Sequence, residues 1–115
     1  MSALKVMIVD DEKHVRESLQ QTLTLEDFDI EACESAQEAL KIIEANWEGI
    51  VITDINMPHM NGVELLERIQ AIDSDIPVIV LTGHGNVSLA VEAMRLGAYD
   101  FLEKPFSVDI LLETV

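Results

Sequence analysis

The chain has 115 residues, 49% of them hydrophobic, which is enough for one domain with a buried core and excludes a disordered chain. No hydrophobic run is long enough to cross a bilayer and the N-terminus lacks the apolar core of a signal peptide, so we expect a soluble cytoplasmic protein. The formal net charge of −15 argues against direct contact with nucleic acid or an anionic membrane, and it suits a basic partner, a bound cation or simple solubility.

Five short stretches predict the strands of one sheet. The clearest is Ile50-Val51-Ile52, whose β-branched side chains are typical of a buried strand and which runs on to Asp54. The single cysteine, Cys33, falls in another predicted strand and is interpreted as a buried, inert thiol. In chain order the predicted strands cover residues 5–9, 28–33, 50–54, 76–81 and 99–103.

A helical pattern follows each of these strands. In the first helix, Val15, Leu19 and Leu23 recur every four residues on one face. Ser35 and Glu38 have the spacing of a capping box at the start of the second helix. Three more helices are predicted after Gly62, between Asn86 and a stop at Gly97, and after Ser107. Alternating strands and helices predict βαβ units, and therefore a parallel sheet with helices on both faces.

Polar residues of different kinds stand where the predicted strands end. Asp10 and Asp11 follow the first strand, Asp54 ends the third, Thr82 follows the fourth and Lys104 follows the fifth. The carboxyl ends of parallel strands meet at one edge of the sheet, where open α/β sheets bind ligands. The sequence therefore predicts that three carboxylates, one hydroxyl and one ammonium gather at this edge. Taken singly, each residue has an ordinary interpretation, as a helix cap, a turn-bonded threonine or a solvated lysine.

Three ionised carboxylates do not gather unaided, because two unit charges ~4 Å apart repel by roughly 4 kcal/mol at an effective dielectric of about 20. Either one carboxylate stays protonated or a cation binds, and Mg²⁺ is the natural candidate because it prefers oxygen ligands. An aspartate can also attack a phosphoryl donor, a reaction that needs charge neutralisation and alignment more than proton transfer. We therefore interpret the site as one for phosphoryl transfer to Asp54, with Lys104 supplying charge and Thr82 a hydrogen bond.

The same residues carry a resemblance to a known family. Over essentially the whole chain the pattern is similar to that of the receiver domains of two-component response regulators, through Asp10-Asp11, Asp54 in TDINMP, Thr82-Gly83 and Lys104-Pro105-Phe106. The stretches LTGHG at 81–85 and AYDFLEKPF at 98–106 further resemble receivers of sigma-54-dependent activators, such as those that control C4-dicarboxylate transport. The resemblance implies a flavodoxin-like, doubly wound, five-stranded parallel α/β sheet in the order 2-1-3-4-5.

The resemblance also implies how the acids act. Asp54 would accept a phosphoryl group from the phosphohistidine of a sensor histidine kinase. Asp11 and Asp54 would bind Mg²⁺ directly, Asn56 would offer its backbone carbonyl, and Asp10 would act mainly through water.

Further implied roles concern the switch. Thr82 and Lys104 would bind the phosphoryl group and relay its presence, and Phe101 holds the position of the family's switch aromatic. Phosphorylation would draw in Thr82 and shift the fourth helix and the fifth strand toward an active packing.

We expect residues 1–115 to form a single receiver domain, with a shortened last helix, that is cut from a longer regulator. The implied partners are a sensor kinase and an output domain, for example an ATPase joined to a DNA-binding domain, while this segment itself touches neither nucleic acid nor membrane. Receivers usually dimerise or contact their output domain through the fourth helix, fifth strand and fifth helix, so the same face could form a homodimer here.

Two other functions are open alternatives to a signalling switch. A Mg²⁺-dependent phosphatase with an aspartyl nucleophile usually has a second carboxylate two residues after the nucleophile, and this chain has Asn56 there. A flavodoxin-shaped binding module without phosphorylation would not need the full set of site residues.

Overall fold

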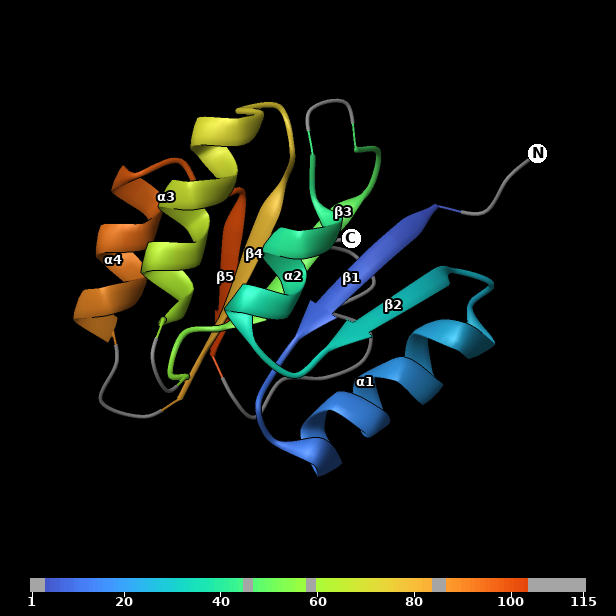
Figure 1. The fold of residues 1–115 in the computed structure, drawn as a ribbon. Coiled ribbons are helices and arrows are strands. Elements are labelled where there is room, and N and C mark those ends of the chain that lie inside the picture. Colours follow the sequence, from blue (N-terminus) through green and yellow to red (C-terminus); the bar gives the residue numbers. More distant parts are fainter. Residues whose placement is uncertain (1–3, 45–46, 58–59, 84–86, 104–115) are drawn as a thin grey trace.

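The computed structural model describes residues 4–44, 47–57, 60–83 and 87–103. They form a five-stranded parallel sheet in the order β2-β1-β3-β4-β5, and four helices that connect the strands (Figure 1). The strands are β1 (Lys5–Val9), β2 (Asp29–Cys33), β3 (Ile50–Asp54), β4 (Val78–Thr82) and β5 (Asp100–Glu103), and the helices are α1 (Lys13–Leu25), α2 (Ala36–Ile42), α3 (Gly62–Ile72) and α4 (Val87–Arg95). The predicted fold and strand order are confirmed, and the fifth helix predicted after Ser107 lies outside the described residues.

The sheet separates two hydrophobic clusters. On one face, side chains such as Met7 and Val80 pack with residues of α2, α3 and α4. On the other face, Ile8 and Ile79 pack with Leu19 and Leu23 of α1. Successive strand residues point to opposite faces, so each of the central strands needs apolar residues at nearly every position. This explains why β1, β3 and β4 are almost continuously buried.

Local hydrogen bonds set the starts of α2 and α3. The predicted N-cap of α2 is confirmed, because the Ser35 hydroxyl accepts a hydrogen bond from the Glu38 N–H at 3.1 Å. At α3, the Asn61 side chain accepts from the Glu64 N–H at 2.9 Å, and the Glu64 carboxylate accepts from the Asn61 N–H at 3.5 Å. This reciprocal pair is a full capping box that fixes where the chain leaves the turn after β3 and enters the helix.

The ends of α1 and α4 share one hydrogen-bond pattern. After α4, the Ala98 N–H donates to the Ala93 carbonyl and Gly97 has a φ of 107°, which confirms the predicted stop. After α1, the Phe28 N–H donates to the Leu23 carbonyl and the left-handed position is held by Asp27, with a φ of 65°. A residue with a Cβ is strained in that conformation, so the α1 turn is less favourable than the α4 turn.

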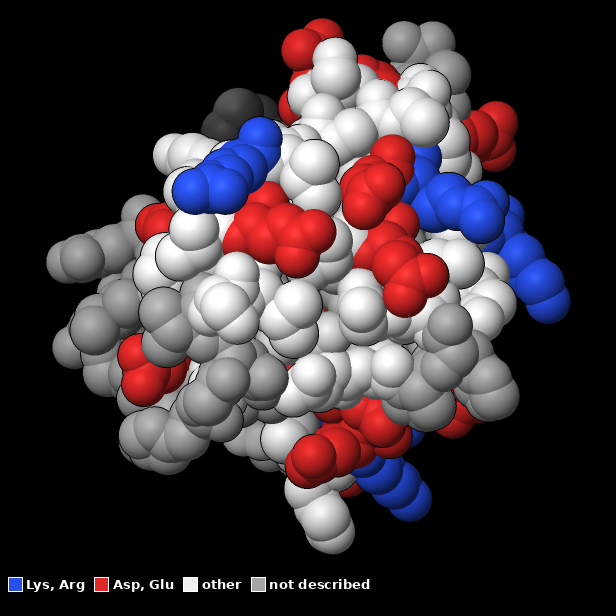
Figure 2. All heavy atoms as spheres, turned by 90° about the vertical axis from the view of Figure 1, so that its left-hand side faces the viewer, with Lys and Arg blue, Asp and Glu red and all other residues white. Residues whose placement is uncertain are grey.

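Acidic and basic side chains are interspersed on one face of the molecule. On the face that forms the left-hand side of Figure 1, acidic side chains lie beside basic ones and do not merge into a single patch (Figure 2). The acidity of this chain therefore does not by itself mark a functional site, and burial and convergence of the acids have to do so.

Candidate functional site

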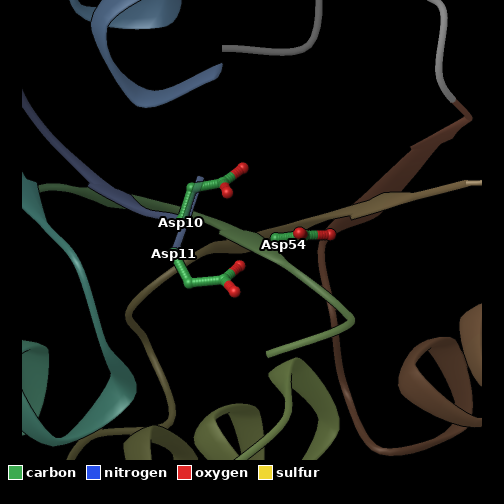
Figure 3. A group of neighbouring side chains, drawn as sticks. All are labelled: Asp10, Asp11 and Asp54. Atoms are coloured by element: carbon green, nitrogen blue, oxygen red, sulfur yellow. The ribbon is translucent and has the colours of Figure 1, made fainter. Parts of the chain in front are cut away.

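Three aspartates meet at the carboxyl edge of the sheet, which we define by the ends of β1, β3 and β4. Asp10 and Asp11 follow β1 and Asp54 is the last residue of β3. One carboxylate oxygen from each lies within 4.8 Å of the others, and the side chains of Asp10 and Asp11 extend toward that of Asp54 (Figure 3). Asp10 and Asp54 are buried, with 0% and 6% of their surface exposed, whereas Asp11 is exposed. The structure thus brings together the acids that the sequence predicted to converge.

Asp10 is tied to its surroundings through its backbone and its side chain. Its N–H donates to the Cys33 carbonyl on β2 at 3.1 Å, and its Oδ1 accepts from the Glu12 N–H at 2.9 Å. Its carbonyl accepts from Nη1 of Arg16 at 2.8 Å. Glu12 is the N-cap residue of α1, but its side chain makes no capping hydrogen bond. The carboxylate of Asp10 therefore stabilises the turn before α1 and also lies close to the carboxylates of Asp11 and Asp54.

The backbone around Asp54 is held from two sides. Its Oδ1 accepts from the Asn56 N–H at 3.4 Å, and its carbonyl accepts from the Thr53 hydroxyl at 3.0 Å. Gly62, at the start of α3, donates its N–H to the Ile55 carbonyl at 2.9 Å. A Cβ at Gly62 would lie 2.6 Å from the Asp54 carbonyl oxygen and 2.8 Å from the Ile55 Cα, closer than real Cβ contacts. Only glycine fits between α3 and the end of β3 without displacing this backbone.

The other predicted site residues lie on β4, on β5 and beyond it. Thr82 is the last residue of β4, is fully buried, and donates its hydroxyl to the Gly83 carbonyl at 3.3 Å. Phe101 is partly buried on β5, beside Val80 of β4, and packs against the cluster that α3 and α4 cover. Lys104 lies outside the described residues.

Cys33 is the last residue of β2, and its carbonyl accepts the hydrogen bond from the Asp10 N–H at this edge. The side chain is buried, and the pKa of the thiol is raised to about 11, chiefly by burial and also by the charges of Glu38 and Glu31, against a smaller opposing effect of Arg16. A thiol with that pKa is protonated at neutral pH and is a poor nucleophile. The predicted burial of Cys33 is confirmed.

The donor set suits a hard cation. It consists of carboxylate oxygens, which Mg²⁺ and Ca²⁺ prefer over nitrogen or sulfur, and 4.8 Å is close enough for all three acids to contact one ion with small side-chain adjustments. Two of the acids are buried, so their mutual repulsion is screened less than at the surface. The same residues can therefore hold a divalent cation, whose charge would offset that repulsion.

The chain from residue 6 to residue 115 matches the family model described as the response regulator receiver domain. The chain belongs to this family. The resemblance seen in the motifs is confirmed. The receiver is 47% identical over 111 residues to the C4-dicarboxylate transport transcriptional regulatory protein DctD of Pseudomonas aeruginosa, which covers 96% of this chain and 24% of that protein. It is 44% identical over 115 residues to the transcriptional regulatory protein FixJ of Rhizobium meliloti, and the matched region covers 100% of this chain and 56% of FixJ.

Solved receiver structures have the same fold. The crystal structure of FixJ-N is 45% identical, superimposes with a TM-score of 0.90, and covers 99% of the receiver and 91% of the solved chain. A receiver domain protein from Clostridium thermocellum is 32% identical, with a TM-score of 0.92 and coverage of 96% and 90%. Both agree with the doubly wound, CheY-like arrangement in Figure 1.

The receiver spans about a quarter of DctD and about half of FixJ. Those regulators therefore contain further segments beside the part that this chain matches. Among the described residues of the receiver, the helices are too short or too polar to cross a membrane.

Sequence reasoning missed two residues that shape the site. Arg16 was not predicted to contact Asp10, because the bond depends on how the turn between β1 and α1 folds the chain back over six residues. Gly62 was interpreted only as the residue after which a helix begins, although it follows a capping asparagine directly, which is the local signal of a tight strand-to-helix entry.

Proposed function

We propose that the receiver accepts a phosphoryl group on Asp54 in a Mg²⁺-dependent reaction, and that this modification switches an output domain. The observation that carries the proposal is the convergence of Asp10, Asp11 and Asp54 within 4.8 Å, with two of the three buried. A cluster of this kind is costly unless a cation is used there, and Mg²⁺ is the usual partner of carboxylates and phosphoryl oxygens.

In the proposed reaction an oxygen of the Asp54 carboxylate attacks the phosphorus of a phosphohistidine. The new O–P bond forms as the P–N bond breaks, and the imidazole nitrogen keeps the electron pair and takes up a proton. Asp11, Asp54 and the Asn56 carbonyl would hold Mg²⁺, and Asp10 would act on it through water. The ion would neutralise the charge on the phosphoryl oxygens. The hydrogen bond from the Asn56 N–H holds the Asp54 carboxylate at the end of β3.

The proposed switch begins at Thr82. Its hydroxyl now donates to the Gly83 carbonyl at 3.3 Å, a long bond that it can exchange for one to a phosphoryl oxygen. Lys104 would contribute positive charge to the same group. Phe101 packs beside β4 and against the α3 and α4 face, so a shift of Thr82 and β4 would change its packing.

We further propose that residues 1–115 are a single receiver domain of a longer cytoplasmic regulator, as the partial coverage of DctD and FixJ suggests. The partners would be a sensor histidine kinase and an output domain that controls transcription, since both relatives are described as transcriptional regulatory proteins. A homodimer through α4, β5 and the fifth helix predicted from the sequence belongs to the same proposal.

The test is phosphorylation by acetyl phosphate in the presence of MgCl₂, followed by mass spectrometry of the intact chain. We expect one added phosphoryl group, none after EDTA treatment, and none in Asp54→Asn. The matched control is Asp75→Asn, which removes an exposed carboxylate elsewhere and should label normally. Labelling that persists in Asp54→Asn would refute the assignment, and steady turnover of p-nitrophenyl phosphate would favour the phosphatase alternative.

A further inference from the structure

Arg16 of α1 reaches back to the acid pair. Its Nη1 donates to the Asp10 carbonyl at 2.8 Å, and its side chain is partly buried. We propose that Arg16 is a positioning residue, which fixes the peptide between Asp10 and Asp11 and thereby sets how these carboxylates face Asp54. This inference rests on the proposed Mg²⁺ site and adds a residue outside the ligand set.

The bonded carbonyl is the group that joins the two acids. It belongs to the peptide unit between Asp10 and Asp11, and that unit is planar, so fixing its oxygen also fixes the nitrogen and Cα of Asp11. Two other bonds of Asp10 act elsewhere: its N–H donates to the Cys33 carbonyl, and its Oδ1 accepts from the Glu12 N–H. The Arg16 bond acts directly on the direction in which the chain leaves β1 at Asp11.

The chemistry of arginine suits this task. A guanidinium stays charged at every accessible pH, and a hydrogen bond from a charged donor is roughly twice as strong as one between neutral groups. Such a bond holds the turn when an ion enters or leaves the acidic group. Supporting contacts behind metal ligands commonly change metal affinity about 10- to 100-fold when they are removed.

The positive charge of Arg16 has an effect of the opposite sign. A cation beside the acids repels Mg²⁺, so charge alone predicts that removing Arg16 tightens metal binding. Positioning predicts that removing it weakens binding. The direction of the change therefore separates the two roles.

The experiment is calorimetric titration of MgCl₂ into the wild-type chain, Arg16→Met and Arg16→Lys, with thermal unfolding of each variant recorded alongside. We expect Arg16→Met to bind Mg²⁺ about tenfold more weakly or worse. Arg16→Lys keeps a charged donor and should fall between Arg16→Met and wild type. The matched control is Arg68→Met, which removes the same charge from an exposed position of α3 and should leave the affinity unchanged.

Three outcomes would overturn the inference. Tighter binding by Arg16→Met would mean that charge, not position, is the effect. Unchanged binding together with a lower unfolding temperature would mean that Arg16 only supports the fold. Absence of Mg²⁺ binding by the wild-type chain would refute the proposed function itself, and this inference with it.

Discussion

The two edges of the sheet are both acidic, and they hold their acids differently. At the carboxyl edge, Asp10 and Asp54 are buried and share a small volume with Asp11. At the amino edge, where β3 and β4 begin, Glu48 and Asp75 are exposed around a cavity of about 350 Å³ beside Trp47. Exposed acids are stabilised by water and need no partner, whereas buried ones need hydrogen bonds or a cation. The burial of the acids, not their number, therefore distinguishes the edge where we propose the functional site.

The largest expected effect comes from Gly62→Ala at the carboxyl edge. The added Cβ would press on the Asp54 carbonyl and the Ile55 Cα, so we expect a loss of roughly 1–3 kcal/mol in the free energy of unfolding and slower phosphorylation of Asp54. Urea unfolding and the acetyl phosphate assay measure the two effects. Gly83→Ala is the control, because nothing in the described part of the chain lies within 4 Å of a Cβ there. Equal stability of the two variants would contradict the packing argument.

A smaller effect is expected when charge is removed from the acids themselves. In EDTA, Asp11→Asn should raise the free energy of unfolding by about 1 kcal/mol, because it relieves repulsion with Asp10 and Asp54. In MgCl₂ the wild-type chain should be at least as stable as the Asp11→Asn variant, because an ion would bind the wild-type chain more tightly than the variant. Urea unfolding in each buffer measures both differences.

Urea unfolding of a variant at the amino edge provides the comparison with Asp11→Asn. Glu48→Gln removes an exposed charge and should change the stability by less than about 0.5 kcal/mol, equally in EDTA and in MgCl₂. If the two substitutions behaved alike, the distinction between the edges would fail.

Another small effect tests the backbone at the amino edge, just before β2 begins. Asp27 holds a left-handed conformation after α1, which glycine adopts without a Cβ penalty, so Asp27→Gly should raise the free energy of unfolding by about 0.5 kcal/mol. Asp29→Gly, in the extended strand β2, should lower it instead. Chemical denaturation of both variants measures the two changes. A lower free energy of unfolding in Asp27→Gly would contradict the prediction, because it would mean that the Asp27 side chain stabilises the turn by more than its left-handed backbone destabilises it.

Much of the fold was predictable because the chain signals it locally. Short β-branched runs and helical spacing gave the elements, and parallel strands necessarily bring Asp10, Asp54 and Thr82 to one edge. Boundaries were less accurate: the strand predicted to begin at Ile76 begins at Val78, although the Pro77 carbonyl already accepts a bond from the Val51 N–H. Proline has no N–H to donate, so regular pairing starts after it.

The remaining features depend on how distant backbone groups meet. The bond from Arg16 to the Asp10 carbonyl requires the particular turn between β1 and α1. The close fit of Gly62 requires that α3 start directly against the end of β3. Neither follows from residue type, since an arginine in a helix is usually solvated and a glycine near a loop usually serves only the turn.

The outermost strands carry a consequence for association between copies. β2 and β5 flank the sheet, and each bears acids, Asp29 and Glu31 on one and Asp100 and Glu103 on the other. Two sheets that approached side by side would align these like charges, which opposes the edge-to-edge pairing that leads to aggregates. The acidic composition of the chain would thus help to keep it dispersed at high concentration.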